Sequence, residues 1–98
     1  MPKGYWVIHF RSITDQSGVD RYAVVAGPAI HNQGGRVIVG GQPRAVFEVG
    51  QLLRTAVVEF ESVERALAAY QSAEYQAAVV HLRGAAERDV RILEGSAG

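Results

Sequence analysis

Residues that could exchange protons are few in this chain, and the most suggestive of them lie in stretches typical of strands. His9, Glu59, and either Asp89 or Arg91 are flanked by β-branched and aromatic residues. Because side chains two apart on a strand share a face, these groups would lie on one face of a sheet. A carboxylate beside an imidazole raises the pKa of the imidazole toward neutrality. We therefore expect His9 and Glu59 to approach each other as a candidate general acid/base pair.

The same polar groups have a second interpretation that involves no chemistry. If two such sheets pack face to face, His9, Glu59 and Arg91 would form a paired polar layer within a dimer interface. The sequence does not distinguish the acid/base pair from the interface layer.

Two further residues are candidates for ligand binding. Tyr75 follows Ser72 at the start of a helix, where it would either pack in the core or line a pocket. Arg83 could bind a ligand carboxylate, although an ion pair on a helix surface is the commoner use of such a residue. The predicted ligand-binding set is therefore His9, Glu59, Tyr75, Arg83 and Arg91.

Composition excludes several classes of function. The chain has no cysteine, so disulfides and thiolate chemistry are absent. Its ten basic residues balance ten acidic ones, which is not the charge pattern of a nucleic-acid-binding domain. His9, His31 and His81 lack the spacing of a metal motif, and the glycine pairs lack the context of a phosphate-binding loop. We expect no metal, no cofactor and no nucleic-acid partner.

No stretch of the chain has the length and apolar character of a membrane span or a signal core. We therefore expect no membrane contact and a cytoplasmic location. A chain of 98 residues with 48% hydrophobic residues predicts one domain over residues 1–98. A domain this small buries a modest fraction of its surface, which favours self-association.

The elements that position the candidate residues follow from periodicity. Alternation predicts strands over 5–10, 36–39, 54–60 and 89–93, with a brief pairing over 45–49. Helical spacing predicts helices over 17–33 and from Val63 onward, the latter restarting after Ser72 and continuing to about Ala86. Pro28 should kink or restart the first helix near Gly27. The order βαββαβ predicts an α+β sandwich, in which helices cover one face of an antiparallel four-stranded sheet.

Two sets of apolar residues should form the core between the sheet and the helices. On the second helix the expected buried residues are Val63, Ala66, Leu67 and Tyr70. On the strands, three apolar rows should face the helices: Trp6, Ile8 and Phe10; Ala56, Val58 and Phe60; Val90 and Ile92.

Several short motifs also carry a family resemblance. They are Gly4-Tyr5-Trp6, Gly34-Gly35-Arg36, Val58-Glu59-Phe60, Ser72-x-Glu74-Tyr75-Gln76, and Arg83 ahead of the last strand. In this order and spacing they resemble the domain-of-unknown-function 1330 family over nearly the whole chain. The resemblance implies a ferredoxin-like fold of the dimeric α/β-barrel group, in which two sheets face each other across a two-fold axis. It implies no established reaction.

Two functions follow as hypotheses. The first is a homodimeric domain that binds a small, partly apolar organic ligand beside the sheet. The alternative is a cofactor-independent enzyme of the oxygenase or isomerase type that uses His9 and Glu59, which rests on fold analogy. A closed pocket with these two side chains in hydrogen-bond reach would favour the enzyme, and a face filled by side chains would favour the first function.

Overall fold

The computed structural model describes residues 2–96, so residues 1, 97 and 98 of the predicted domain lie outside the described part. The elements follow the predicted alternation of strands and helices. They are β1 (Gly4–Ile13), α1 (Gln16–Asn32), β2 (Arg36–Gly41), β3 (Thr55–Phe60), α2 (Val63–Gln71), α3 (Ala73–Val79), a short 3₁₀ helix η1 (Val80–Leu82) and β4 (Ala86–Glu94).

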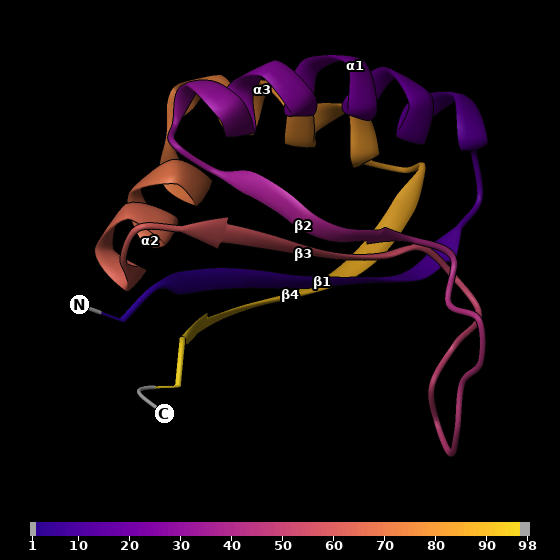
Figure 1. Ribbon diagram of the computed structural model, residues 1–98. Helices are drawn as coiled ribbons and strands as arrows, with labels where there is room; N and C mark the ends of the chain where they lie inside the picture. The colour runs from indigo at the N-terminus through magenta and orange to yellow at the C-terminus, as the bar shows by residue number, and fades with distance from the viewer. Residues whose placement is uncertain (1, 97–98) are drawn as a thin grey trace.

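The four strands form one antiparallel sheet in the order β2-β3-β1-β4. All helices of the described residues lie on one side of this sheet, and within residues 2–96 its other side carries none (Figure 1). This arrangement confirms the predicted ferredoxin-like α+β sandwich. We call the helix-free side of the sheet the open face.

The predicted apolar rows form the core between the sheet and the helices. Trp6, Val58 and Phe60 are at most 1% exposed, and the Trp6 and Phe60 rings lie 4.8 Å apart between centroids. The indole of Trp6 donates a 2.8 Å hydrogen bond to the Ala66 carbonyl oxygen, which anchors β1 to α2. A buried donor of this kind must find an acceptor, so this bond fixes the position of the helix on the sheet.

Side-chain caps fix where the helices begin. The hydroxyl oxygen of Ser62 accepts from the backbone N–H of Arg65, and that of Ser72 accepts from the N–H of Tyr75, both at 3.1 Å. Each bond satisfies a donor that has no partner in the first turn of a helix. The serine caps therefore separate α2 from α3, as predicted.

The predicted helix over residues 73–86 was too long. Regular helix ends at Val79, and after η1 the chain reaches Gly84, whose φ of 72° lies in the left-handed region. A residue in this conformation stops a right-handed helix. The carbonyl oxygen of Ala85 instead accepts from the backbone N–H groups of Thr14 and Asp15, at 2.8 and 3.0 Å, so Ala86 begins β4.

Two further predictions about elements were wrong, and a third was wrong in part. Residues 45–49 form no strand and belong to the loop between β2 and β3. Leu67 is 43% exposed, whereas Ala69 is buried beside Ala66 on α2. Of the two outcomes predicted at Pro28, a kink or a restart, the restart does not occur, because α1 continues through this residue.

The loop between β2 and β3, residues 42–54, extends away from the body on the side opposite the helices (Figure 1). Near its tip Phe47 is 81% exposed and Val49 is 96% exposed. Within residues 2–96, no helix has both the length and the apolar character needed to cross a membrane.

Candidate functional site

The register of the sheet separates the two residues predicted to form an acid/base pair. Glu59 lies opposite Tyr5, whereas His9 lies opposite Thr55 on β3 and Asp89 on β4. His9 and Glu59 are therefore four positions apart along the strands, or about 13 Å at the usual rise per residue. The expected contact is not formed within the chain, because alternation determines the face of a strand residue but not its cross-strand neighbour.

Each of these polar residues has a different partner on the open face. Glu59 accepts from the Tyr5 hydroxyl at 3.0 Å and pairs with Arg36 at 3.1 Å. The hydrogen bond from Tyr5 is the main reason that the pKa of Glu59 is lowered, and Arg36 adds to it. The ring nitrogen Nδ1 of His9 lies 3.3 Å from the Thr55 hydroxyl oxygen.

Arg91, the third predicted residue on this face, forms a two-bond ion pair with its neighbour Asp89. The guanidinium Nε and Nη2 donate to the two carboxylate oxygens at 3.0 and 3.1 Å. These bonds are the largest cause of the lowered pKa of Asp89. Because the pair occupies the Nε–Nη2 edge of Arg91, this edge is not available for another carboxylate.

Two hollows of about 480 and 440 Å³ lie on the open face, on either side of the loop of residues 42–54. His9, Gly50 and Gln51 line both of them. Arg91 and Asp89 line the smaller one, and Glu59 lines neither.

The other two predicted ligand-binding residues lie elsewhere. Tyr75 is completely buried on the helix side of the sheet, and burial raises the pKa of its hydroxyl far above the usual range. Arg83 is exposed at the end of η1 and forms no ion pair among the described residues. The five predicted residues are therefore spread over the open face, the core and the end of η1.

The structure points instead to Arg88, which is not among the five predicted residues. Its Nη1 donates to the hydroxyl oxygens of Tyr22 and Tyr75, both at 3.1 Å, and these two oxygens are 2.6 Å apart. The guanidinium carbon lies 5.0 Å from the centroid of the Tyr22 ring and 5.9 Å from that of Phe10. We call Tyr22 and Tyr75 the tyrosine pair.

Arg88 is partly buried but has no acidic partner within residues 2–96. Its Nε and Nη2 form no hydrogen bond with the described residues. Because no buried side-chain nitrogen or oxygen atom of these residues lacks a partner, Nε and Nη2 must be accessible to solvent. A guanidinium is always charged in a protein, and its Nε–Nη2 edge matches the two oxygens of a carboxylate. Arg88 therefore offers a free anion-binding edge in a partly buried place.

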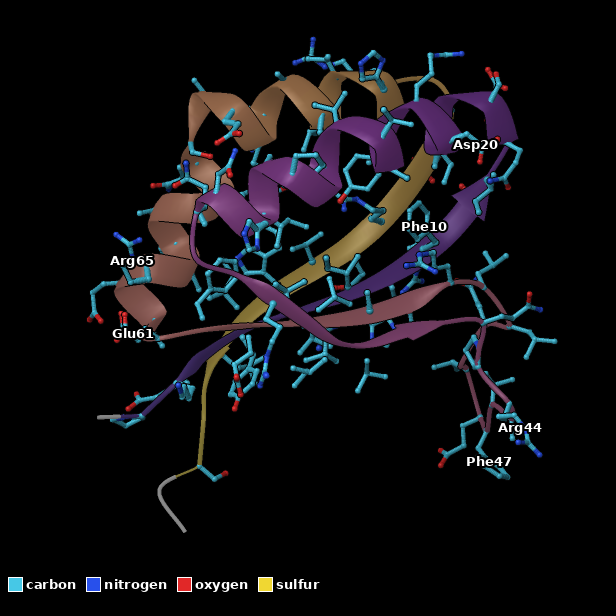
Figure 2. The ribbon with its side chains drawn as sticks, turned by 45° about the horizontal axis from the view of Figure 1, so that its top comes forward. Phe10, Asp20, Arg44, Phe47, Glu61 and Arg65 are labelled. Atoms are coloured by element: carbon cyan, nitrogen blue, oxygen red, sulfur yellow. The ribbon has the colours of Figure 1, made fainter. Side chains whose placement is uncertain are left out.

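A cavity of about 430 Å³ lies between α1 and the sheet, next to this guanidinium. Its walls are mainly apolar, and Phe10, which contributes to them, lies between the sheet and α1 in Figure 2. Two arginines line it, Arg54 and Arg88, whereas Asp20 is its one acidic lining residue. We call this space, which Tyr22 also lines, the Arg88 cavity.

The signal for Arg88 was present in the sequence. The alternation that places Val90 and Ile92 toward the helices continues back to residue 88, but the predicted strand began at Asp89. A predicted strand that began at Ala86, where β4 begins, would have placed Arg88 in the same row as Val90 and Ile92. Nothing in the sequence indicated that the hydroxyl of Tyr22 meets that of Tyr75.

The chemistry available at the Arg88 cavity is recognition of a negative charge next to apolar surface. Among the described residues, no group of three or more His, Cys, Asp or Glu side chains is arranged to hold a metal ion.

Comparison with known proteins gives a family and a fold. The family described as "Domain of unknown function (DUF1330)" matches residues 3–96. No curated protein matches the sequence.

Three solved structures illustrate the similarity. A protein of unknown function from Rhodopseudomonas palustris is 18% identical, with a TM-score of 0.71 over 99% of this chain and 85% of that one. A dimeric ferredoxin-like protein of unknown function from Thermobifida fusca is 13% identical, with a TM-score of 0.67 over 95% of this chain and 91% of that one. SnoaB, a cofactor-independent oxygenase from Streptomyces nogalater, is 8% identical, with a TM-score of 0.67 over 100% of this chain and 97% of that one. At these identities the comparisons establish the fold alone.

Proposed function

The chain belongs to the DUF1330 family, and from this premise we propose that it binds a small, partly apolar organic anion in the Arg88 cavity. The observation that carries the proposal is a partly buried arginine with a free Nε–Nη2 edge and no acidic partner among the described residues. A cavity of about 430 Å³ also falls within the size range of small-molecule sites, roughly 300–1,000 Å³.

The kind of ligand follows from the lining. Phe10, Val19 and Ile30 offer apolar surface, while the two arginines attract a negative group. A carboxylate on a short alkyl chain or a single ring satisfies both. A cation or a strongly polar sugar would leave either the guanidinium or the apolar wall without a matching group.

Isothermal titration calorimetry with benzoate and hexanoate tests the proposal, with benzyl alcohol and hexanol as neutral probes of the same shape. We expect the carboxylates to bind and the alcohols to bind at least about tenfold more weakly, since a hydrogen bond to a charged group contributes roughly 1.5–3 kcal/mol. Arg88→Gln should lose the carboxylate binding. Arg54→Gln, an exposed change in the same wall, should weaken it without removing it.

Arg91→Gln is the matched control, because it removes the same charge from the open face. If Arg91→Gln abolished binding and Arg88→Gln did not, the site would lie on the open face beside His9, as first hypothesised from the sequence. Circular dichroism of each variant checks that it is folded.

The enzyme hypothesis remains a second candidate, but its acid/base pair changes. The similarity to SnoaB, a cofactor-independent oxygenase, concerns the fold. Within one chain the register separates His9 from Glu59, so these two side chains do not form an acid/base pair with each other there. Among the residues that line the Arg88 cavity, Asp20 and Tyr22 carry groups that can exchange a proton.

We also propose that the chain forms a homodimer through the open face. Leu93 and Val39 lie on this face and are 50% and 59% exposed, and the exposed Phe47 and Val49 extend beside it. Apolar surface of this kind on a small domain is typical of an interface. The similar protein from Thermobifida fusca is a dimeric ferredoxin-like protein, which supports the proposal.

A further inference from the structure

A second arginine lines the Arg88 cavity, and the sheet places it across β1 from Arg88. The backbone N–H of Phe10 donates to the carbonyl oxygen of Arg54 at 3.0 Å, so Arg54, the residue before β3, lies beside Phe10. On the other side of Phe10, β4 places Arg88 at the paired position. The three residues form one cross-strand row, so the Cα atoms of the two arginines lie roughly 9–10 Å apart, about twice the usual distance between neighbouring strands.

The two guanidinium groups occupy different parts of the cavity. That of Arg88 is held by the tyrosine pair and lies over the rings of Tyr22 and Phe10. That of Arg54 extends toward β2, because a Cβ atom added to Gly40 would lie 3.4 Å from its Nη2. The cavity therefore has two separate positive charges, with the apolar side chain of Phe10 in the row between them.

The described residues neutralise neither charge. Arg54 and Arg88 form no ion pair within residues 2–96. The acidic lining residue Asp20 is exposed, and its Oδ1 accepts from Nε2 of Gln16 at 3.0 Å. Two like charges on one cavity repel each other, and a ligand with one carboxylate can pair with only one of them. A ligand that brings an anionic group to each guanidinium pairs with both.

We propose that the Arg88 cavity accepts a dicarboxylate, with one carboxylate on Arg88, the apolar middle of the ligand over Phe10 and the second carboxylate on Arg54. This inference rests on the proposed function and deepens it by naming the class of ligand. In this role Arg54 is a specificity-determining residue, which selects a dianion over a monoanion of the same length.

Isothermal titration calorimetry with two matched pairs of ligands tests the inference. Adipate is hexanoate with a second carboxylate at the far end of the chain, and terephthalate is benzoate with a second carboxylate across the ring. We expect each dicarboxylate to bind the wild type about fivefold more tightly than its monocarboxylate, because it gains one partly exposed ion pair. The ratio of the two dissociation constants is compared among variants, since the two equivalent ends of a dicarboxylate contribute the same statistical factor in each.

Arg54→Gln should remove most of this preference, because the second carboxylate loses its partner, whereas hexanoate and benzoate keep theirs on Arg88. Arg44→Gln is the matched control, since Arg44 is an exposed arginine that lines a hollow on the open face, and it should keep the wild-type ratio. Both changes are at exposed positions, so both variants should fold.

NMR of the arginine side chains tests the two contacts without relying on affinity. In proton–nitrogen correlation spectra, Arg54→Gln and Arg88→Gln assign the two Nε–H signals by their disappearance. Adipate should shift both signals, and hexanoate should shift that of Arg88 more than that of Arg54. An Arg54 signal that adipate and hexanoate move equally would overturn the inference.

An equal ratio of dissociation constants in the wild type and Arg54→Gln would also overturn it. So would a ratio that falls as far in Arg44→Gln, because the preference would then reflect the net charge of the molecule. These results leave the proposed function intact as long as Arg88→Gln abolishes hexanoate binding. A wild-type protein that binds none of the four ligands would instead overturn the proposed function, and with it the role of Arg54.

Discussion

At the scale of single residues, the position of a side chain on its strand determines which chemistry it can join. Arg88 and Asp89 are neighbours in the sequence, yet one points toward the helices and a cavity and the other toward the open face. Alternation alone predicted the face of His9, Glu59 and Arg91. It could not predict their neighbours, because the register depends on how the connecting loops set one strand against the next.

The Tyr5 hydroxyl should control the ionisation of Glu59. Its hydrogen bond is the main cause of the lowered pKa of Glu59, so Tyr5→Phe should raise that pKa toward the ordinary value of about 4.3. A lowered folded pKa contributes stability that is present above the unfolded pKa and is lost as the pH falls through the folded one. Tyr5→Phe should therefore reduce the acid sensitivity of folding.

NMR titration of the Glu59 carboxyl, with Tyr70→Phe as the control, measures this effect. Tyr70 forms no hydrogen bond with Glu59 among the described residues, so its variant should titrate as the wild type does. An unchanged Glu59 pKa in Tyr5→Phe would show that Arg36 alone maintains the shift.

Tyr75 should make folding sensitive to alkali. Burial raises the pKa of its hydroxyl, so its contribution to stability is complete below the unfolded pKa of about 10 and falls as the pH rises above it. The urea-unfolding free energy of the wild type should therefore fall steeply above that pH. Tyr75→Phe should show a shallower fall, and equal slopes for the two proteins would contradict the assignment of Tyr75 as a buried phenol.

At the scale of the elements, the sequence predicted the helices and strands well wherever local chemistry determines them. The serine caps at Ser62 and Ser72 act through the backbone a few residues away, and the apolar rows act through a period of two. The end of α3 was missed because alanines favour helix locally, whereas the bonds from Thr14 and Asp15 to Ala85 come from a distant part of the chain.

Phe60→Ala should be one of the most destabilising substitutions in the sheet. The ring is 1% exposed and packs against Trp6, so its removal leaves a cavity that costs about 3–5 kcal/mol of unfolding free energy. Glu61→Ala, at the next, exposed position, should change stability by less than about 0.5 kcal/mol. Chemical denaturation of the two variants checks the difference, and equal midpoints would contradict the assignment of Phe60 to the core.

At the scale of the whole molecule, the sandwich leaves two different faces. The helix side contains the core and the Arg88 cavity, and the open face carries paired ions, exposed apolar residues and the loop of residues 42–54 (Figure 2). The sequence predicted that these faces would differ. It did not predict which one contains the cavity with the free arginine, because that depends on how α1 packs against the sheet.

The open face should form the dimer interface. Sedimentation equilibrium at micromolar concentration should show a dimer for the wild type and a monomer for Leu93→Lys, which places a charge on an exposed apolar position of that face. Val24→Lys is the matched control, because Val24 is 76% exposed on α1, and it should remain dimeric. A wild-type monomer, or a dimer that survives Leu93→Lys but not Val24→Lys, would contradict this interface.

The most direct test of the central claim is a crystal structure of the protein with para-bromobenzoate, because the anomalous signal of bromine locates the ligand without ambiguity. We predict bromine among the apolar residues of the Arg88 cavity, with the carboxylate on the Nε–Nη2 edge of Arg88. Bromine on the open face beside His9, or a carboxylate that makes no contact with Arg88, would contradict the account.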